Sequence, residues 1–202
     1  MVELDGTVEV IGPDGPVPFL DLFQGCDELL VYKHMWHDGA PHQGQCEGCT
    51  VSAWHLRDTP YLEARGVSFA ILTEGPWGEV APYLEFMGYT QPWYSVRDAA
   101  APVGGDMGMF SCFLRVDDRV FLTYETTGRG TEPASGSFAL LDMTVYGRGE
   151  AWEDNPEGWP ALDGQSWRSD ADGVATWGPT SRPVPQSTRP GATPVETLDR
   201  HD

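Results

Sequence analysis

The chain has 202 residues, enough for one well-buried domain but not comfortably for two. Its 12 basic and 31 acidic residues give a net charge of −19, and such a surface repels nucleic acid and anionic lipid, so neither partner is expected. No apolar run reaches the roughly 18 residues that span a bilayer. Residues 1–6 lack the basic and apolar regions of a signal peptide, so we expect a cytoplasmic protein that does not enter a membrane.

The first part of the chain predicts short β structure around one buried strand. Residues 8–11 are β-prone, and the Gly and Pro residues at 12–16 predict a turn. Residues 17–23 form a short apolar element that we expect to make one helical turn. The apolar run at 29–35 has the length and composition of a buried central strand.

The middle of the chain alternates between helix and strand. Such alternation predicts right-handed crossovers and a partly parallel sheet, and a βαβ half followed by a β-hairpin is the thioredoxin plan. We therefore expect an α/β fold, with a thioredoxin-like mixed sheet flanked by helices. The predicted elements are helices at 50–56, 61–65 and 79–87, a strand at 67–72, a hairpin at 109–116 and 119–124, and a last strand or helix at 138–141.

A Cys-x-x-Cys pair, Cys46 and Cys49, follows the central strand after a Gly-rich loop. Strand, loop, Cys-x-x-Cys and helix is the layout of a thioredoxin-type dithiol, because a helix N-terminus stabilises a thiolate. We expect Cys46 to be the exposed nucleophile and Cys49 the resolving thiol, with no cofactor required. Glu47 lies between them, and its negative charge disfavours a thiolate, which argues against a strongly oxidising pair.

The histidines before the pair suggest a metal site as the alternative function. His37 and His42 precede Cys46 and Cys49 closely, and two cysteines with one or two histidines are donors that suit zinc or copper. The spacing matches no zinc-finger consensus, so His37 and His42 are also compatible with ordinary polar loop residues. His34 lies within the predicted strand, where we expect it to pack in the core or on a sheet face.

Two further functions remain open at this stage. A peroxidase needs a threonine before the nucleophile and a distant arginine, but Thr50 follows the pair, and Arg129 fits a surface role better. A non-catalytic interaction module would have thiols that do not react at neutral pH. The proline that usually faces a thioredoxin dithiol in the cis form is not found next to the hairpin, and Pro102 could serve only if the loop were longer than usual.

The composition changes near the C-terminus. We place the domain at 1–148 and a Gly/Pro/Trp-rich tail at 149–202, partly packed on the domain and disordered from about 182. Four tryptophans are unusual for a linker: Trp152, Trp159, Trp167 and Trp177. They are compatible with two interpretations, a tail whose first part packs on the domain and a poorly ordered tail in which the tryptophans are incidental. Outside the pair, we expect Cys112 to be buried and inert in its strand and Cys26 to be exposed in a turn.

Several fragments in a fixed order carry a family resemblance. They are G-P-D-G-P-V-x-x-x-D-L-F-x-G (12–25), L-L-V-Y-x-x-M (29–35), the Cys46/Cys49 pair, L-E-A-R-G-V (62–67), F-M-G-Y-x-x-P-W (86–93), R-V-F-L-T-Y-E-T (119–126), R-G (129–130) and L-D-M-T-x-x-G-R (141–148).

On these fragments the chain resembles the thioredoxin-like family known as domain of unknown function 899, described as predicted dithiol–disulfide oxidoreductases. The resemblance implies a thioredoxin-like fold and a redox role for Cys46 and Cys49. A disulfide-containing protein or a small-molecule thiol would then be the substrate. The chain departs from the family pattern at 33–34, where Lys-His stands in place of His-Phe, and in its ending, which only partly matches Trp-x-x-Arg-His-Asp.

Overall fold

The computed structural model describes residues 1–147, 157–158 and 185–191. Its strands are β1 (Val2–Leu4), β2 (Glu9–Gly12), β3 (Gly15–Pro18), β4 (Glu28–His34), β5 (Val67–Thr73), β6 (Trp93–Ser95), β7 (Met109–Val116) and β8 (Arg119–Thr127). Its helices are η1 (Phe19–Phe23), η2 (His42–Gly44), α1 (Glu47–His55), α2 (Pro60–Glu63), α3 (Trp77–Met87), η3 (Gly128–Ala134), α4 (Gly136–Leu141) and α5 (Pro185–Thr188), where η marks a 3₁₀-helix. None of the helices in these ranges is long and apolar enough to cross a membrane.

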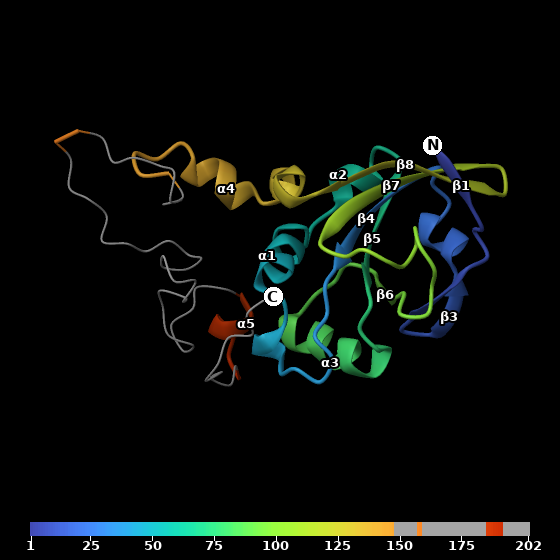
Figure 1. Ribbon diagram of the computed structural model, residues 1–202, viewed down its shortest axis with the longest axis horizontal. Coiled ribbons are helices and arrows are strands. Elements are labelled where there is room, and N and C mark those ends of the chain that lie inside the picture. Colours follow the sequence, from blue (N-terminus) through green and yellow to red (C-terminus); the bar gives the residue numbers. More distant parts are fainter. Residues whose placement is uncertain (148–156, 159–184, 192–202) are drawn as a thin grey trace.

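The strands of the described residues form a single sheet in the order β1-β8-β7-β4-β5-β6-β2-β3 (Figure 1). β4, β5 and β6 run parallel to one another, whereas β7 is antiparallel to β4 and β8 is antiparallel to β7. The parallel pair β4-β5 with the hairpin β7-β8 beside it is the thioredoxin plan. The predicted fold class is therefore confirmed.

β4 is the strand at the centre of this plan, and both of its faces are covered. Strands buried on both faces are near-continuous apolar runs, as the sequence of β4 indicates. Leu29 and Val31 pack with η1 and β7 in one core, and Tyr32 packs with α1 and α3 in a second core on the opposite face. The carboxyl end of β4 continues into the loop that ends at the Cys-x-x-Cys pair.

Short edge elements are where the structure departs from the expected strands. β1 and β6 were not expected, because three residues carry too little pattern to be recognised and each strand gains its hydrogen bonds from a distant partner. The predicted turn at 12–16 is tighter than expected, since β2 and β3 pair from Gly12 opposite Gly15 onward. β8 continues to Thr127, three residues beyond the predicted end of the hairpin.

The chain leaves the sheet after β8. The expected last element at 138–141 is helical, within α4, which projects away from the sheet in Figure 1. α5 falls within the stretch for which disorder is expected, but it forms a short helix that packs on α1 and η2. The four tail tryptophans lie outside the described residues, so the expectation that they pack on the domain stays a prediction.

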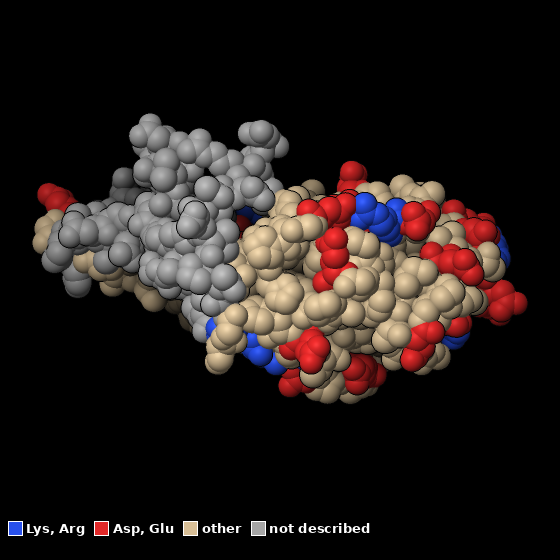
Figure 2. Space-filling model, turned by 90° about the horizontal axis from the view of Figure 1, so that it is seen from below, with Lys and Arg blue, Asp and Glu red and all other residues tan. Residues whose placement is uncertain are grey.

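Acidic side chains are spread over the face seen in Figure 2, with uncharged residues between them. This distribution fits a solvated surface that carries the net charge of −19.

Candidate active site

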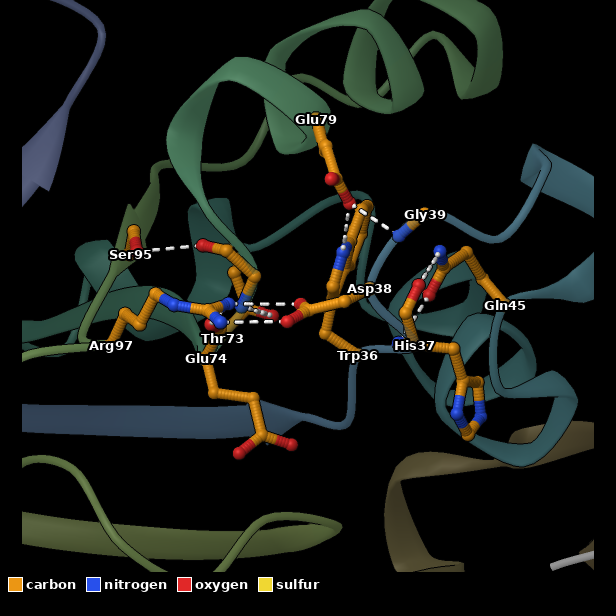
Figure 3. Close-up of polar contacts among 11 residues, drawn as sticks. Trp36, His37, Asp38, Gly39, Gln45, Thr73, Glu74, Glu79, Ser95 and Arg97 are labelled. Atoms are coloured by element: carbon orange, nitrogen blue, oxygen red, sulfur yellow. Dashed lines mark hydrogen bonds and ion pairs between the residues drawn. The ribbon is translucent and has the colours of Figure 1, made fainter.

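The loop between β4 and α1 is held by side chains, and it leads directly into the Cys-x-x-Cys pair. Gln45 bonds to the His37 backbone in both directions, with Nε2 donating to the carbonyl and Oε1 accepting from the N–H, each at 3.0 Å (Figure 3). Glu79 of α3 accepts from the Trp36 indole N–H at 3.1 Å and from the Gly39 N–H at 3.0 Å. The loop is thus tied both to itself and to α3.

A second anchor lies on the other side of the same loop. Arg97 donates to both carboxylate oxygens of Asp38, at 2.8 and 2.6 Å, and these hydrogen bonds, together with the charge of Arg97, lower the pKa of that carboxyl (Figure 3). Both side chains are about half exposed, so solvent screening keeps the contribution of this ion pair to stability small. Gly75 is required beneath Trp36, because a Cβ there would lie 2.5 Å from the indole ring.

Cys46 is the N-cap residue of α1. Its Sγ accepts a hydrogen bond from the N–H of Cys49 at 3.4 Å, so the sulfur faces the free N–H groups of the first helical turn. These groups and the helix dipole favour a negative charge at that position. The local structure therefore fits Cys46 for the role of a thiolate nucleophile, as the spacing predicts.

Cys49 is the buried member of the pair, with 2% of its surface exposed. The Met35 N–H donates to its Sγ at 3.4 Å, and Tyr32 packs in the same buried core. The nearby Cys46 sulfur, followed by burial, raises the pKa of the Cys49 thiol well above its ordinary value, against the opposing effects of Tyr32 and of the Met35 N–H. Cys49 therefore keeps its proton.

Cys46 is more buried than the sequence suggests. Only 8% of its surface is exposed, so the expectation of an exposed nucleophile is wrong. The thioether of Met35 lies 4.0 Å from the Cys46 sulfur, and a Cβ at Gly108 would lie 3.3 Å from the same thioether. The flexible side chain that follows β4 is thus in contact with the Cys46 sulfur, so a substrate must pass beside it or displace it.

Three hydroxyls fix the first turn of α1 against α3. Thr50 donates to the carbonyl of Cys46 at 2.7 Å, so its oxygen is left to accept from Tyr83 at 2.8 Å. Tyr89 donates to the Thr50 carbonyl at 3.2 Å. Burial raises the pKa of Tyr83 and of Tyr89, which keeps both phenols protonated. The position of the dithiol therefore depends on a polar network within the second core.

The structure does not gather the candidate metal ligands into one cluster. In residues 1–147, 157–158 and 185–191, no three His, Cys, Asp or Glu side chains are placed to hold an ion. The ring of His42 packs on Phe86 with centroids 4.8 Å apart, and partial burial lowers its pKa. His37 lies in the loop with its backbone bound to Gln45. No observation within the described residues thus favours ligation by His37 and His42.

His34 is a core residue, as its place in the strand predicts. It is 0% exposed, and burial lowers its pKa to about 4. Its Nδ1 lies 2.6 Å from the Met35 carbonyl, and because a carbonyl only accepts, the proton is on Nδ1. The ring packs 5.1 Å from that of Trp93. His34 therefore belongs to the packing behind the dithiol.

A proline in the cis form is present after all. The Ala101–Pro102 peptide is cis, in the loop between β6 and the hairpin. The buried ammonium of Lys33 donates to the carbonyls of Pro102 and Gly104, at 2.7 and 2.9 Å. The N–H of Gly108 donates to the Lys33 carbonyl at 2.7 Å. Lys33 thus joins this loop to the central strand.

The remaining candidates lie away from the pair. Arg129 is exposed and bonds to Glu132 at 3.1 Å, which fits the expected surface role. Cys112 is only partly buried although β7 pairs with β4 on one side and β8 on the other, so the expectation of a buried thiol is wrong. Cys26 is likewise partly buried where we expect exposure.

Four residues around the dithiol were not identified as part of the site from the sequence: Tyr32, Met35, Thr50 and Tyr83. The alternation of side chains along β4 could have placed Tyr32 on the helix-covered face, under the pair. Nothing local marks the Tyr83 contact, which joins residues 33 positions apart.

The family model described as "bacterial protein of unknown function (DUF899)" matches residues 1–171. The chain belongs to this family. The match covers every element from β1 to α4, including the whole site described above. None of the curated proteins is similar enough to match the chain.

Three solved structures that are similar to this chain are distant from it in sequence. Peroxidoxin BcpB from Mycobacterium tuberculosis is 19% identical, covers 69% of this chain and 95% of its own, and has a TM-score of 0.46. A cysteine-to-serine mutant of peroxiredoxin Q from Xanthomonas campestris is 14% identical, with coverage of 68% and 92% and a TM-score of 0.45. A thioredoxin from Wuchereria bancrofti is 14% identical, with coverage of 67% and 90% and a TM-score of 0.42. The strand order establishes the fold without them, and they say nothing of activity here.

Proposed function

We propose that this member of the family is a thiol–disulfide oxidoreductase that uses Cys46 and Cys49. The observation that carries the proposal is the place of Cys46 as N-cap of α1, with its sulfur bound by the N–H of Cys49 at 3.4 Å. All four cysteines are free thiols, so the pair is available in its reduced form. A dithiol of this kind suits a reducing compartment, and we propose the cytoplasm.

The proposed reaction follows from the different environments of the two thiols, since Cys46 is the N-cap of α1 and Cys49 is buried. The Cys46 thiolate attacks one sulfur of a substrate disulfide, forming a mixed disulfide and releasing the other sulfur as a thiolate. Cys49 then attacks the Cys46 sulfur, and the second substrate sulfur leaves with its electron pair. The protein ends with a Cys46–Cys49 disulfide, and the substrate gains two electrons and two protons as two thiols. An external thiol reverses both steps to restore the dithiol.

The cover over Cys46 narrows the substrate class. With 8% of its surface exposed and Met35 4.0 Å away, the sulfur can be reached by a small-molecule disulfide or by an extended disulfide-bearing segment of a protein. A rigid, flat protein surface could not reach it without moving Met35. We therefore propose small or flexible disulfides as substrates.

The test is a thiol–disulfide equilibrium with mass analysis. The protein is equilibrated in mixtures of reduced and oxidised dithiothreitol, and peptide mapping should find one reversible disulfide that joins Cys46 and Cys49. Cys46→Ser should abolish turnover of a small disulfide while leaving the fold intact. Cys49→Ser should trap the mixed disulfide on Cys46. Full turnover by Cys46→Ser would refute the mechanism.

Two controls accompany this test. Cys26→Ser and Cys112→Ser change thiols outside the pair, and both should keep wild-type turnover. Metal analysis of the same freshly purified protein should find far less than one equivalent. One equivalent of zinc or copper with shielded thiols, lost in His37→Ala, would support the metal-binding hypothesis in place of the redox one.

A further inference from the structure

A short segment near the C-terminus, residues 185–191, packs beside the dithiol. It contains α5, and it contacts η2 and α1, the helical elements that lie just before and just after Cys46 (Figure 1). The segment lies beyond residues 1–171, so its contact with the site is outside the match to the family. The dithiol therefore has neighbours that neither the Cys-x-x-Cys spacing nor the family fragments indicate.

Gln186 of this segment reaches the backbone immediately before the nucleophile. Its side-chain Nε2 donates to the carbonyl of Gln45 at 3.1 Å, across 141 positions of sequence. Gln186 is 0% exposed and Gln45 is 2% exposed, so a carbonyl that loses this donor loses it in a buried place, where the loss is costly. The Gln45 carbonyl and the Cys46 N–H belong to one planar peptide group, so this bond also orients the backbone of Cys46.

That orientation decides where the Cys46 sulfur lies. The side chain of Gln45 is already held by the His37 backbone, so the donor from Gln186 adds a second support at the peptide itself. The Cys46 sulfur accepts from the Cys49 N–H at 3.4 Å, at the N-terminus of α1. A rotation of the peptide would turn the sulfur away from this N–H and from the helix dipole, both of which favour a thiolate.

Arg189 anchors the segment three residues further on. Its Nε donates to the carbonyl of Phe86 at 2.6 Å, in the last turn of α3, where the helix dipole favours a cation. The guanidinium carbon of Arg189 lies 5.5 Å from the ring centroid of Trp54 on α1 and 6.0 Å from that of Phe86. The segment is thus attached to both helices that cover the dithiol face of the sheet, and Gln186 is held close to Gln45.

We propose that Gln186 is a positioning residue of the dithiol, which holds the Gln45–Cys46 peptide so that the Cys46 sulfur stays at the N-terminus of α1. This inference rests on the proposed function. Gln186 acts through the peptide and takes no part in the exchange of sulfurs. Arg189 contributes indirectly, because it keeps the segment in place.

The test measures how fast Cys46 reacts with iodoacetamide over a range of pH. The full chain carrying Cys26→Ser, Cys49→Ser and Cys112→Ser keeps Cys46 as its only thiol, and mass analysis follows the alkylated fraction with time. Because iodoacetamide reacts with the thiolate, the midpoint of the rate against pH reports how strongly the site favours a charged sulfur. This chain is the parent of the variants below.

Gln186→Met keeps the length of the side chain but cannot donate to the Gln45 carbonyl. It should move the midpoint up by about half a pH unit and slow alkylation at neutral pH about threefold, because part of the helix N-terminal stabilisation is lost. Arg189→Met weakens the anchor and should slow alkylation about twofold. Arg57→Met is the matched control: Arg57 donates to the Gly88 carbonyl at 2.8 Å and lies 4.2 Å from the Trp54 ring centroid, but it is not part of the segment, so neither rate nor midpoint should change.

A parental rate and midpoint in both Gln186→Met and Arg189→Met would overturn the role of Gln186. Faster alkylation in Gln186→Met would also overturn it, because that is the result of a segment that only shields the thiol. An equal change in Arg57→Met would assign the effect to the packing around Trp54 and overturn it as well. The oxidoreductase proposal is tested apart from these variants, since it fails if the chain with both Cys46 and Cys49 forms no reversible disulfide in dithiothreitol mixtures, whatever the alkylation rates show.

Discussion

The two faces of β4 have different tasks although the strand is buried on both. On one face Leu29 and Val31 pack into an apolar core with η1, and Lys33 holds the loop around Pro102. On the other face Tyr32 and His34 bring polar atoms into the aromatic core beneath α1 and α3. The first face contributes mainly to the stability of the fold. The polar atoms on the second face contribute less to stability and instead help to position the dithiol. The predictions below separate these two contributions.

The largest effect is expected on the apolar face. Phe19 is fully buried, with its ring centroid 5.0 Å from that of Phe113 and 6.3 Å from that of Phe23. Phe19→Ala should lower the free energy of unfolding by about 3–5 kcal/mol through lost burial and the cavity left behind. Urea unfolding followed by circular dichroism measures this loss. Turnover of a small disulfide by the folded variant should stay within twofold of wild type, and a larger change would show that the two faces are coupled.

His34 should make stability depend on pH. Its pKa is about 4 in the folded protein and near 6.5 when unfolded, so between these values the unfolded chain binds more protons. Stability from the neutral ring is complete above pH 6.5 and is lost as the pH falls toward 4, by about 3 kcal/mol. Urea unfolding at pH 7.5, 5.5 and 4.5 should show this fall. His34→Leu should remove most of the slope in this window, and an unchanged slope would assign the dependence to other groups.

The sequence predicts most of the fold and only half of the site. Local sequence patterns predict four of the elements: β4, β5, α3 and the hairpin of β7 and β8. These patterns are apolar runs, the alternation of apolar and polar residues, and Gly88, which ends α3 in the left-handed region. Cys46 and Cys49 are recognised by their spacing. Tyr83, Met35 and the buried Nζ of Lys33 act across 11 to 71 positions of sequence, so their contacts depend on how the finished sheet and helices pack.

The smallest expected effect concerns Met35, because we expect its side chain to limit the access of a disulfide to the Cys46 sulfur. Its thioether lies 4.0 Å from the Cys46 sulfur, and its side chain also contacts the position of Gly108. Met35→Ala removes the side chain beside Cys46 but keeps the backbone N–H that binds Cys49, so only the attack of Cys46 on a disulfide should change. With an excess of 5,5′-dithiobis(2-nitrobenzoate), that attack is measured as the first release of the coloured thiolate. We expect that release to become roughly threefold faster, because the reagent no longer has to displace a flexible side chain. Met35→Leu is the matched control: it restores the bulk without sulfur, and it should return the rate to near the wild-type value. A slower first release in Met35→Ala would instead show that the thioether assists the thiolate, and that Met35 contributes to the chemistry of Cys46 as well as to its cover.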